Sequence, residues 1–188
     1  MTSEPIAFVD PMGLEDWFAA NHGDATVLWI RIYQKSSSVT SVDWVTCVEV
    51  ALCWGWIDGQ KKSFDAESYL QRMTPRRPGS SWSKRNVEHV ERLVAAGRMQ
   101  PAGLAKVDAA KADGRWDAAY DGSANMTIPQ DFLLALDGNP AARTTFDTLK
   151  RSALFSIYAQ LHSAKKPATR ANRMARMIDR LARGEMPH

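Results

Sequence analysis

Hydrophobic and polar positions in the first 120 residues follow a helical pattern in some segments and a strand pattern in others. Apolar residues recur at helical spacing behind an Asp-Pro pair, which predicts a helix over residues 11–22. Residues 25–35 instead alternate apolar and polar, which predicts a strand with one buried face. The same criteria predict helices over about 41–53 (capped by Ser41), 81–97 and 104–114, and strands over 56–62 and 67–74.

The remainder of the chain carries only helical patterns. Helices are expected over about 130–137, 140–149, 153–164 and 170–183, after a linker of sequence NMTIPQ. We therefore expect an α+β protein, with a small antiparallel sheet and flanking helices in residues 1–125. An all-helical C-terminal lobe is expected in residues 126–188.

The composition is that of a globular protein. Hydrophobic residues make up 45% and charged residues 24% of the 188 positions, which excludes the disordered and fibrous classes. There is no run of the roughly 18–20 apolar residues that a membrane span needs, and MTSEPIAFVD lacks the basic and apolar regions of a secretion signal. We therefore expect a cytoplasmic protein without a membrane span.

The cysteines and histidines lack the spacing of a metal site or a disulfide framework. Cys47 and Cys53 are the two cysteines, and the four histidines are scattered along the chain. We expect no metal, no disulfide and no cofactor. Cys53 ends a predicted helix, where the negative end of the helix dipole disfavours a thiolate, so an inert thiol is expected unless a nearby lysine lies over it.

Positive charge is concentrated in the later part of the chain. Residues 1–60 hold two basic and eight acidic side chains, whereas residues 61–188 hold 22 basic and 13 acidic ones. Seven basic and two acidic side chains fall within residues 61–86. Prolines and a glycine break this segment into a bend, and the helix expected after it would present free N–H groups near Ser83. This pattern predicts a site for a small anion, with arginines as bidentate contacts.

The predicted ligand site joins this bend to the WIDG turn at residues 56–59. Asp58 can either stabilise the turn or orient a basic neighbour, and Trp56 and Trp82 can either fill a core or stack on a planar ligand. No Ser-His-Asp, Cys-His or paired-carboxylate set accompanies them, so no catalytic residue is assigned. The candidate ligand-binding residues are Trp56, Asp58, Lys61, Arg72, Arg76, Arg77, Trp82, Ser83, Lys84 and Asn86.

The last predicted helix carries an arginine stripe, which consists of Arg173, Arg176, Arg180 and Arg183. At about 100° per residue these side chains fall within an arc of roughly 80°, and the apolar residues gather on a different side. The stripe is either a solvated face or a contact surface for nucleic acid or an acidic partner. A net charge of +3 and the lack of a nucleic-acid-binding motif favour the first interpretation.

Four segments carry a family resemblance: ALCWGWIDGQKKS, RMTPRRPGSSWSKRNVEHVERL, GRMQPAGLAKVDAAKADGRWDAAYD and KKPATRANRMARMIDRLARGE. Over about residues 8–186 the chain resembles the YdeI/OmpD-associated family, also called bacteriocin-protection-like proteins. The family pattern falls on Cys53, Gly55, Trp56, Ile57, Asp58, Gly59, Thr74, Pro75, Arg76, Trp82 and Ser83. Trp54 departs from it, since a smaller aromatic such as Phe is expected there. The resemblance implies a bacterial, cytosolic protein linked to stress and antimicrobial-peptide tolerance, and it transfers no catalytic residue.

Three functional hypotheses follow from the sequence. The first is a binding protein, or an enzyme of unassigned reaction, that holds a small anionic ligand, phosphorylated ligands included, between the WIDG turn and the basic bend. The second is a nucleic-acid or acidic-partner module that uses the arginine stripe. The third is a structural adaptor that acts through contact with another protein.

Overall fold

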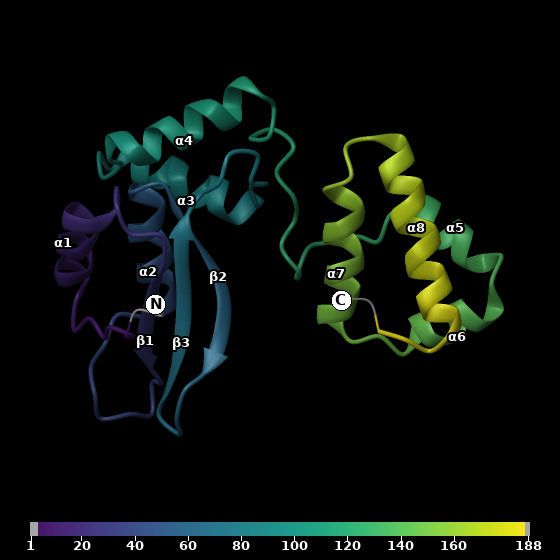
Figure 1. Ribbon diagram of the computed structural model, residues 1–188, viewed down its shortest axis with the longest axis horizontal. Helices are drawn as coiled ribbons and strands as arrows, with labels where there is room; N and C mark the ends of the chain where they lie inside the picture. The colour runs from purple at the N-terminus through teal and green to yellow at the C-terminus, as the bar shows by residue number, and fades with distance from the viewer. Residues whose placement is uncertain (1–3, 187–188) are drawn as a thin grey trace. The chain divides into compact units, whose positions relative to one another are not determined.

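A computed structural model describes residues 4–186, which form two compact units: residues 4–82 with 86–118, and residues 83–85 with 119–186. In chain order, the elements up to residue 112 are α1 (Pro11–Asn21), β1 (Leu28–Tyr33), α2 (Trp44–Cys53), β2 (Trp56–Ser63), β3 (Ser68–Pro75), α3 (Lys84–Ala95) and α4 (Pro101–Ala112) (Figure 1). They are followed by α5 (Gln130–Asp137), α6 (Pro140–Asp147), α7 (Arg151–His162) and α8 (Pro167–Ala182). The predicted α+β class with a helical C-terminal part is confirmed.

The three strands form an antiparallel sheet in the order β1-β3-β2. Leu28, Ile30 and Ile32 are buried on one face, and the residues between them are half-buried, as the alternating pattern predicted. The pairing of β2 with β3 shifts between Asp58 and Lys61, so that β2 contains one extra residue there. This bulge determines which β2 side chains share a face.

Aspartates at two helix starts explain where α1 and α2 begin. The carboxylate of Asp10 accepts the N–H of Gly13 at 2.9 Å, and that of Asp43 accepts the N–H of Thr46 at 2.8 Å. The expected cap at Ser41 is therefore wrong. Its hydroxyl accepts the N–H of Tyr33 at 3.0 Å and thus contacts the end of β1 instead.

A tight bend between α2 and β2 brings several segments together. Gly55 has a φ of +75°, a conformation that glycine adopts without strain. The carbonyl of Gly55 accepts the N–H of Arg76 at 2.9 Å, and the carbonyl of Cys53 accepts the N–H of Gln100 at 3.1 Å. The bend therefore connects the end of β3 to the start of α4.

The start of α4 lies unusually close to this bend. A Cβ atom built on Gly103 would lie 2.2 Å from the carbonyl oxygen of Cys53, which is far inside van der Waals contact. Only glycine at position 103 permits this approach of the two backbones.

The second unit has its own apolar core, formed by α5 to α8. Its buried members are Phe132, Leu136, Ala142, Phe146, Leu149, Ile157, Leu161, Met177 and Leu181. The guanidinium of Arg170 donates to both carboxylate oxygens of Asp131, with NH2 at 2.8 Å from each, and so connects α8 to α5. Helix α8 begins at Pro167, three residues earlier than predicted, because proline is well suited to the first helical position.

Candidate functional site

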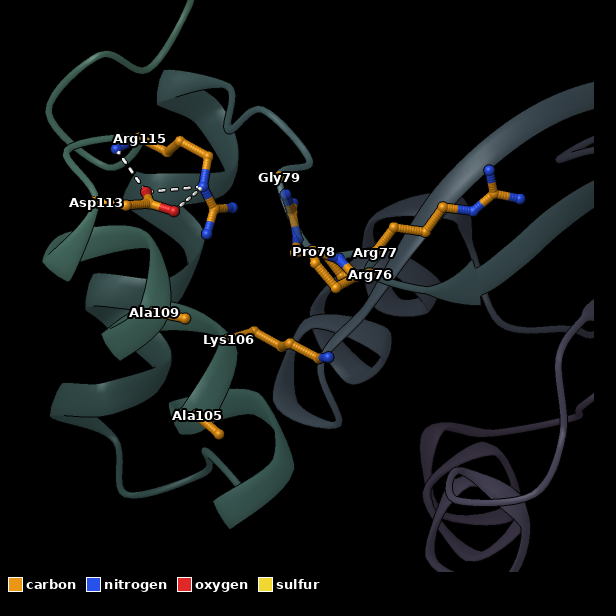
Figure 2. A pocket seen from close by; sticks show the side chains of 9 residues that line it. All are labelled: Arg76, Arg77, Pro78, Gly79, Ala105, Lys106, Ala109, Asp113 and Arg115. Carbon is orange, nitrogen blue, oxygen red and sulfur yellow. Dashed lines mark hydrogen bonds and ion pairs between the residues drawn. The ribbon is translucent and has the colours of Figure 1, made fainter.

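A cationic cavity lies in the first unit between the loop after β3 and helix α4 (Figure 2). We call it the basic hollow. Its volume is about 310 Å³, and its lining residues are Arg76, Arg77, Pro78, Gly79, Ala105, Lys106, Ala109, Asp113 and Arg115. Four of these carry positive charge and one carries negative charge.

One wall of the basic hollow is a β-turn formed by Arg77, Pro78, Gly79 and Ser80. The N–H of Ser80 donates to the carbonyl of Arg77 at 3.1 Å, and Gly79 has a φ of +78°. Proline followed by a glycine with positive φ is typical of a type II turn. The PG dipeptide therefore explains why the chain reverses here.

Arg76 belongs to the wall and is almost completely buried, with 2% of its surface exposed. Its guanidinium stacks on the ring of Trp82 at 3.6 Å from the ring centroid, and its NH1 donates to the carbonyl of Ser81 at 2.9 Å. Both contacts hold the loop in shape, so replacing Arg76 or Trp82 would disturb the wall as well as its charge.

Arg115 forms the opposite end of the lining and is also buried. Its Nε donates to the carboxylate of Asp113 at 2.7 Å, and its NH1 donates to the carbonyl of Ser80 at 2.8 Å. The side chain of Asp113 is 52% exposed and that of Arg115 only 9%. Asp113 therefore supplies the one carboxylate of the lining and partly neutralises a buried guanidinium.

Helix α4 forms the remaining side of the basic hollow. Ala105 and Ala109 lie one turn apart, and their small side chains leave room for the cavity. In Figure 2, Lys106 extends from α4 toward the loop that contains Arg76, whereas the guanidinium of Arg77 extends away from the other lining side chains. Lys106 is half-buried, and the exposed Arg77 lies at the rim of the hollow.

A second hollow lies in the same unit and contains two other predicted site residues. Its volume is about 440 Å³, and its lining residues are Trp44, Asp58, Gly59, Lys61, Tyr69 and Gln71. Asp58 and Lys61 therefore line a different cavity from Arg76 and Arg77. The site that the sequence predicted as one pocket is divided between two.

Three other predicted ligand residues, Trp56, Asn86 and Arg72, are placed by the core and the sheet of the first unit. Trp56 is 1% exposed, and its Nε1 donates to the carbonyl of His22 at 3.2 Å, so its ring faces the core. Asn86 is buried in α3. Arg72 lies directly opposite Trp29 in the sheet and so points to the face away from Gln71.

The expected cradle of free N–H groups near Ser83 is partly occupied by the chain itself. Ser83 forms an isolated bridge with Tyr120, and the N–H of Lys84 donates to the carbonyl of Tyr120 at 2.9 Å. The ammonium of Lys84 pairs with Asp121 at 2.8 Å, and this hydrogen bond raises the pKa of Lys84. The Lys84 amide therefore cannot serve a bound anion.

The arginine stripe of α8 is largely engaged within the second unit. NH1 of Arg173 donates to the carbonyl of Gln160 at 2.6 Å, Arg180 pairs with Glu185 at 3.3 Å, and Arg183 pairs with both Asp179 and Glu185. Arg176 is exposed. Hydrogen bonding to Arg183 lowers the pKa of Glu185, so this carboxylate stays charged and competes with any outside anion.

Both cysteines are buried and lie outside the two hollows. Burial raises the pKa of Cys47 to about 12 and that of Cys53 to about 11. Neither thiol is therefore suited to act as a nucleophile near neutral pH. Within residues 4–186, no three His, Cys, Asp or Glu side chains gather in a metal-binding arrangement, and no helix is long and apolar enough to cross a bilayer.

Sequence reasoning missed three charged residues of the basic hollow: Lys106, Asp113 and Arg115. Lys106 and Asp113 lie two helical turns apart, a spacing that places them on one face of a helix. That local signal is present in the sequence, but it does not indicate that this face of α4 lies opposite the basic bend.

Two family models match the chain. Residues 6–106, more than half of the 188 positions, match the family described as Domain of unknown function (DUF8412). Residues 125–184 match the family described as Bacteriocin-protection, YdeI or OmpD-Associated. The second match confirms the resemblance found in the sequence, but over a shorter range than residues 8–186. Searches of curated proteins and of solved structures gave no match.

Proposed function

The chain belongs to the family described as Domain of unknown function (DUF8412) and carries a C-terminal segment of the bacteriocin-protection, YdeI or OmpD-associated family, and we propose that its first unit binds a small anionic ligand in the basic hollow. The ligand class is a molecule with a phosphate or carboxylate group. We assign binding to this site and no reaction.

The charge of the basic hollow is the observation that carries this proposal. Its lining contains four cations, Arg76, Arg77 at the rim, Lys106 and Arg115, and one carboxylate, that of Asp113, which leaves an excess of three positive charges. Cations that line a concave surface raise the local concentration of anions and strengthen their binding. The volume of about 310 Å³ lies at the lower end of the range of small-molecule sites, about 300–1,000 Å³.

The lining favours binding over catalysis. It contains no histidine, cysteine or serine, so a nucleophile with an adjacent general base is missing from this set of residues. The buried guanidinium groups of Arg76 and Arg115 are held by backbone carbonyls and are positioned before a ligand arrives. Lys106 supplies a mobile ammonium that can follow the ligand.

The cellular role that we propose is stress or antimicrobial-peptide tolerance in the cytoplasm of a bacterium. Its support is the name of the family that matches residues 125–184 and the resemblance found in the sequence. In this proposal the anion-binding unit senses or stores a small metabolite.

Equilibrium unfolding in urea, with and without inorganic phosphate, tests the anion site. All seven tryptophans lie at or before residue 116, within the first unit, so their fluorescence reports on that unit alone. A ligand at 100 times its Kd stabilises the folded state by about 2.7 kcal/mol. We expect phosphate to raise the urea midpoint more than chloride does at the same ionic strength.

A matched pair of variants connects the effect to the hollow. Lys106→Gln removes the lysine of the lining, whereas Lys111→Gln removes the same charge from the same helix outside the lining. The phosphate effect should fall in the first variant and persist in the second. Equal phosphate and chloride effects, or an effect unchanged by Lys106→Gln, would refute the proposal.

The sequence also predicted two alternatives, a nucleic-acid or acidic-partner module and a structural adaptor. The pairing of Arg180 and Arg183 with carboxylates reduces the charge that the stripe offers to a polyanion. Binding of single-stranded DNA that falls steeply with salt and is lost in Arg176→Gln would favour the first alternative over the anion site.

A further inference from the structure

We propose that the second hollow is a binding site for a small zwitterion, such as a free amino acid or a dipeptide. This site is separate from the basic hollow, and the proposal does not depend on the proposed function. Its charged lining residues are Asp58 and Lys61, one of each sign, whereas the basic hollow carries an excess of positive charge. A lining with one positive group, one negative group and no net charge fits a ligand that carries both charges itself.

The bulge in β2 places both charged groups on one face of the sheet. In a regular strand, side chains three positions apart point to opposite faces. Here Asp58 pairs with Met73 and Lys61 pairs with Gln71, so three steps along β2 correspond to two along β3. Paired residues of antiparallel strands share a face. Asp58, Lys61 and Gln71 therefore lie on the same side of the sheet.

Gln71 provides a fixed acceptor for this hollow. It is 2% exposed, and its Nε2 donates to the carbonyls of Gly59 at 3.0 Å and Arg72 at 3.3 Å. Because both partners are carbonyl groups, the amide can have only one orientation. Within residues 4–186 both hydrogen bonds of this side chain use Nε2, which leaves its carbonyl oxygen to accept from a ligand.

Lys61 provides the donor. Its ammonium lies over the ring of Tyr69, with Nζ at 3.8 Å from the ring centroid. Within the described residues this lysine has no carboxylate at ion-pair distance, and its exposed ammonium is compensated by the ring and by solvent. A ring face leaves the N–H groups of the ammonium directed elsewhere, and they can donate to a carboxylate.

These groups match the two ends of a zwitterion. The ligand ammonium would donate to the carboxylate of Asp58 and the carbonyl oxygen of Gln71, and its carboxylate would accept from Lys61. A volume of about 440 Å³ is sufficient for an amino acid or a dipeptide. A planar base fits less well, because Lys61 already covers one face of the Tyr69 ring.

Nuclear magnetic resonance of the ¹⁵N-labelled full chain tests the site directly. The side-chain amide of Gln71 and the indole N–H of Trp44 are the reporters, and the probes are glycine, L-leucine, L-phenylalanine and glycylglycine. Each probe is compared with its N-acetyl form and its carboxamide form, which lack the ammonium and the carboxylate respectively. We expect a saturable shift with at least one free probe, and binding weaker by about tenfold for both blocked forms.

Variants separate this site from a general charge effect. Lys61→Met should weaken binding by about tenfold, and Asp58→Asn should do the same. Lys62→Met is the control, because Lys62 pairs with Leu70 and points to the other face. Retained shifts in Lys62→Met, with intact backbone spectra in all three variants, would support the site.

Several results would overturn the proposal. They are no saturable shift with any probe at millimolar concentration, equal binding of the free and blocked forms, and equal losses in Lys61→Met and Lys62→Met. Uridine or guanosine that shifts the Gln71 amide more than any amino acid would assign a planar ligand instead. The outcome of this experiment does not affect how the phosphate test is interpreted, because that test uses residues outside the second hollow.

Discussion

Replacing Gly103 by alanine is expected to destabilise the first unit by about 3 kcal/mol. The new Cβ would lie 2.2 Å from the carbonyl oxygen of Cys53 and 2.8 Å from that of Leu52, against an ordinary contact of at least 3.4 Å. The atoms it meets are backbone atoms near the end of α2, which cannot rotate away as a flexible side chain would. The start of α4 must therefore move away from α2.

The size of the effect follows from three terms. Overpacking in a tight interior typically costs about 1–3 kcal/mol, and a contact with backbone falls at the upper end of that range. Separation of the helices would also weaken the hydrogen bond from the N–H of Gln100 to Cys53, which contributes about 1 kcal/mol. Alanine offsets about 1 kcal/mol of this through its better helix propensity.

Urea unfolding followed by tryptophan fluorescence measures this loss. Gly13→Ala is the matched control, because Gly13 and Gly103 are each the third residue of a helix that begins with proline. A Cβ on Gly13 would meet its nearest atom at 3.6 Å, so alanine there should stabilise by about 0.5–1 kcal/mol. If Gly103→Ala were as stable as the original chain, or if both variants lost the same stability, the close packing of α2 and α4 would be refuted.

Three further outcomes are expected. Asp113→Asn should raise phosphate affinity up to about fivefold, because it removes a carboxylate that competes for Arg115; unchanged or weaker binding would contradict this. Cys47 and Cys53 should not react with a thiol reagent at pH 8 in the folded protein and should both react in urea; rapid labelling of the folded chain would contradict their burial. Hydrogen bonds from Arg170 lower the pKa of Asp131, so the stability contributed by this pair should be present above about pH 4 and lost as the pH falls through the lowered value. Unfolding followed by circular dichroism should show that the stability of Asp131→Asn depends less on pH than that of the original chain. An equal pH dependence in both proteins would exclude this pair as its source.

The elements of the fold were predictable because their signals are local. Alternation in β1 reflects one buried face, and proline or aspartate at the helix starts marks where α1, α4 and α6 begin. The cap of α2 was misplaced because a serine and an aspartate both precede the helix, and only tertiary contacts show that the hydroxyl of Ser41 contacts β1. Local sequence does not contain that information.

The candidate site was predictable only in part, because its two walls lie far apart along the chain. The Pro78–Gly79 turn and the cations beside it were visible as a motif, but the facing wall of α4 begins more than 20 residues later. Its placement depends on the close contact of Gly103 with Cys53. The bulge in β2 had no sequence signal either, and it is what separates Lys61 from the basic bend and places it with Gln71.

The bend at Cys53 and Gly55 has a consequence for ligand selection. Both walls of the basic hollow attach to it through backbone hydrogen bonds, one from Arg76 and one from Gln100. The two walls are therefore positioned by backbone hydrogen bonds to the same few residues, and little of the contact energy would go into ordering them. For the proposed anion site we therefore expect selection by size, with small anions bound in preference to bulky polyanions.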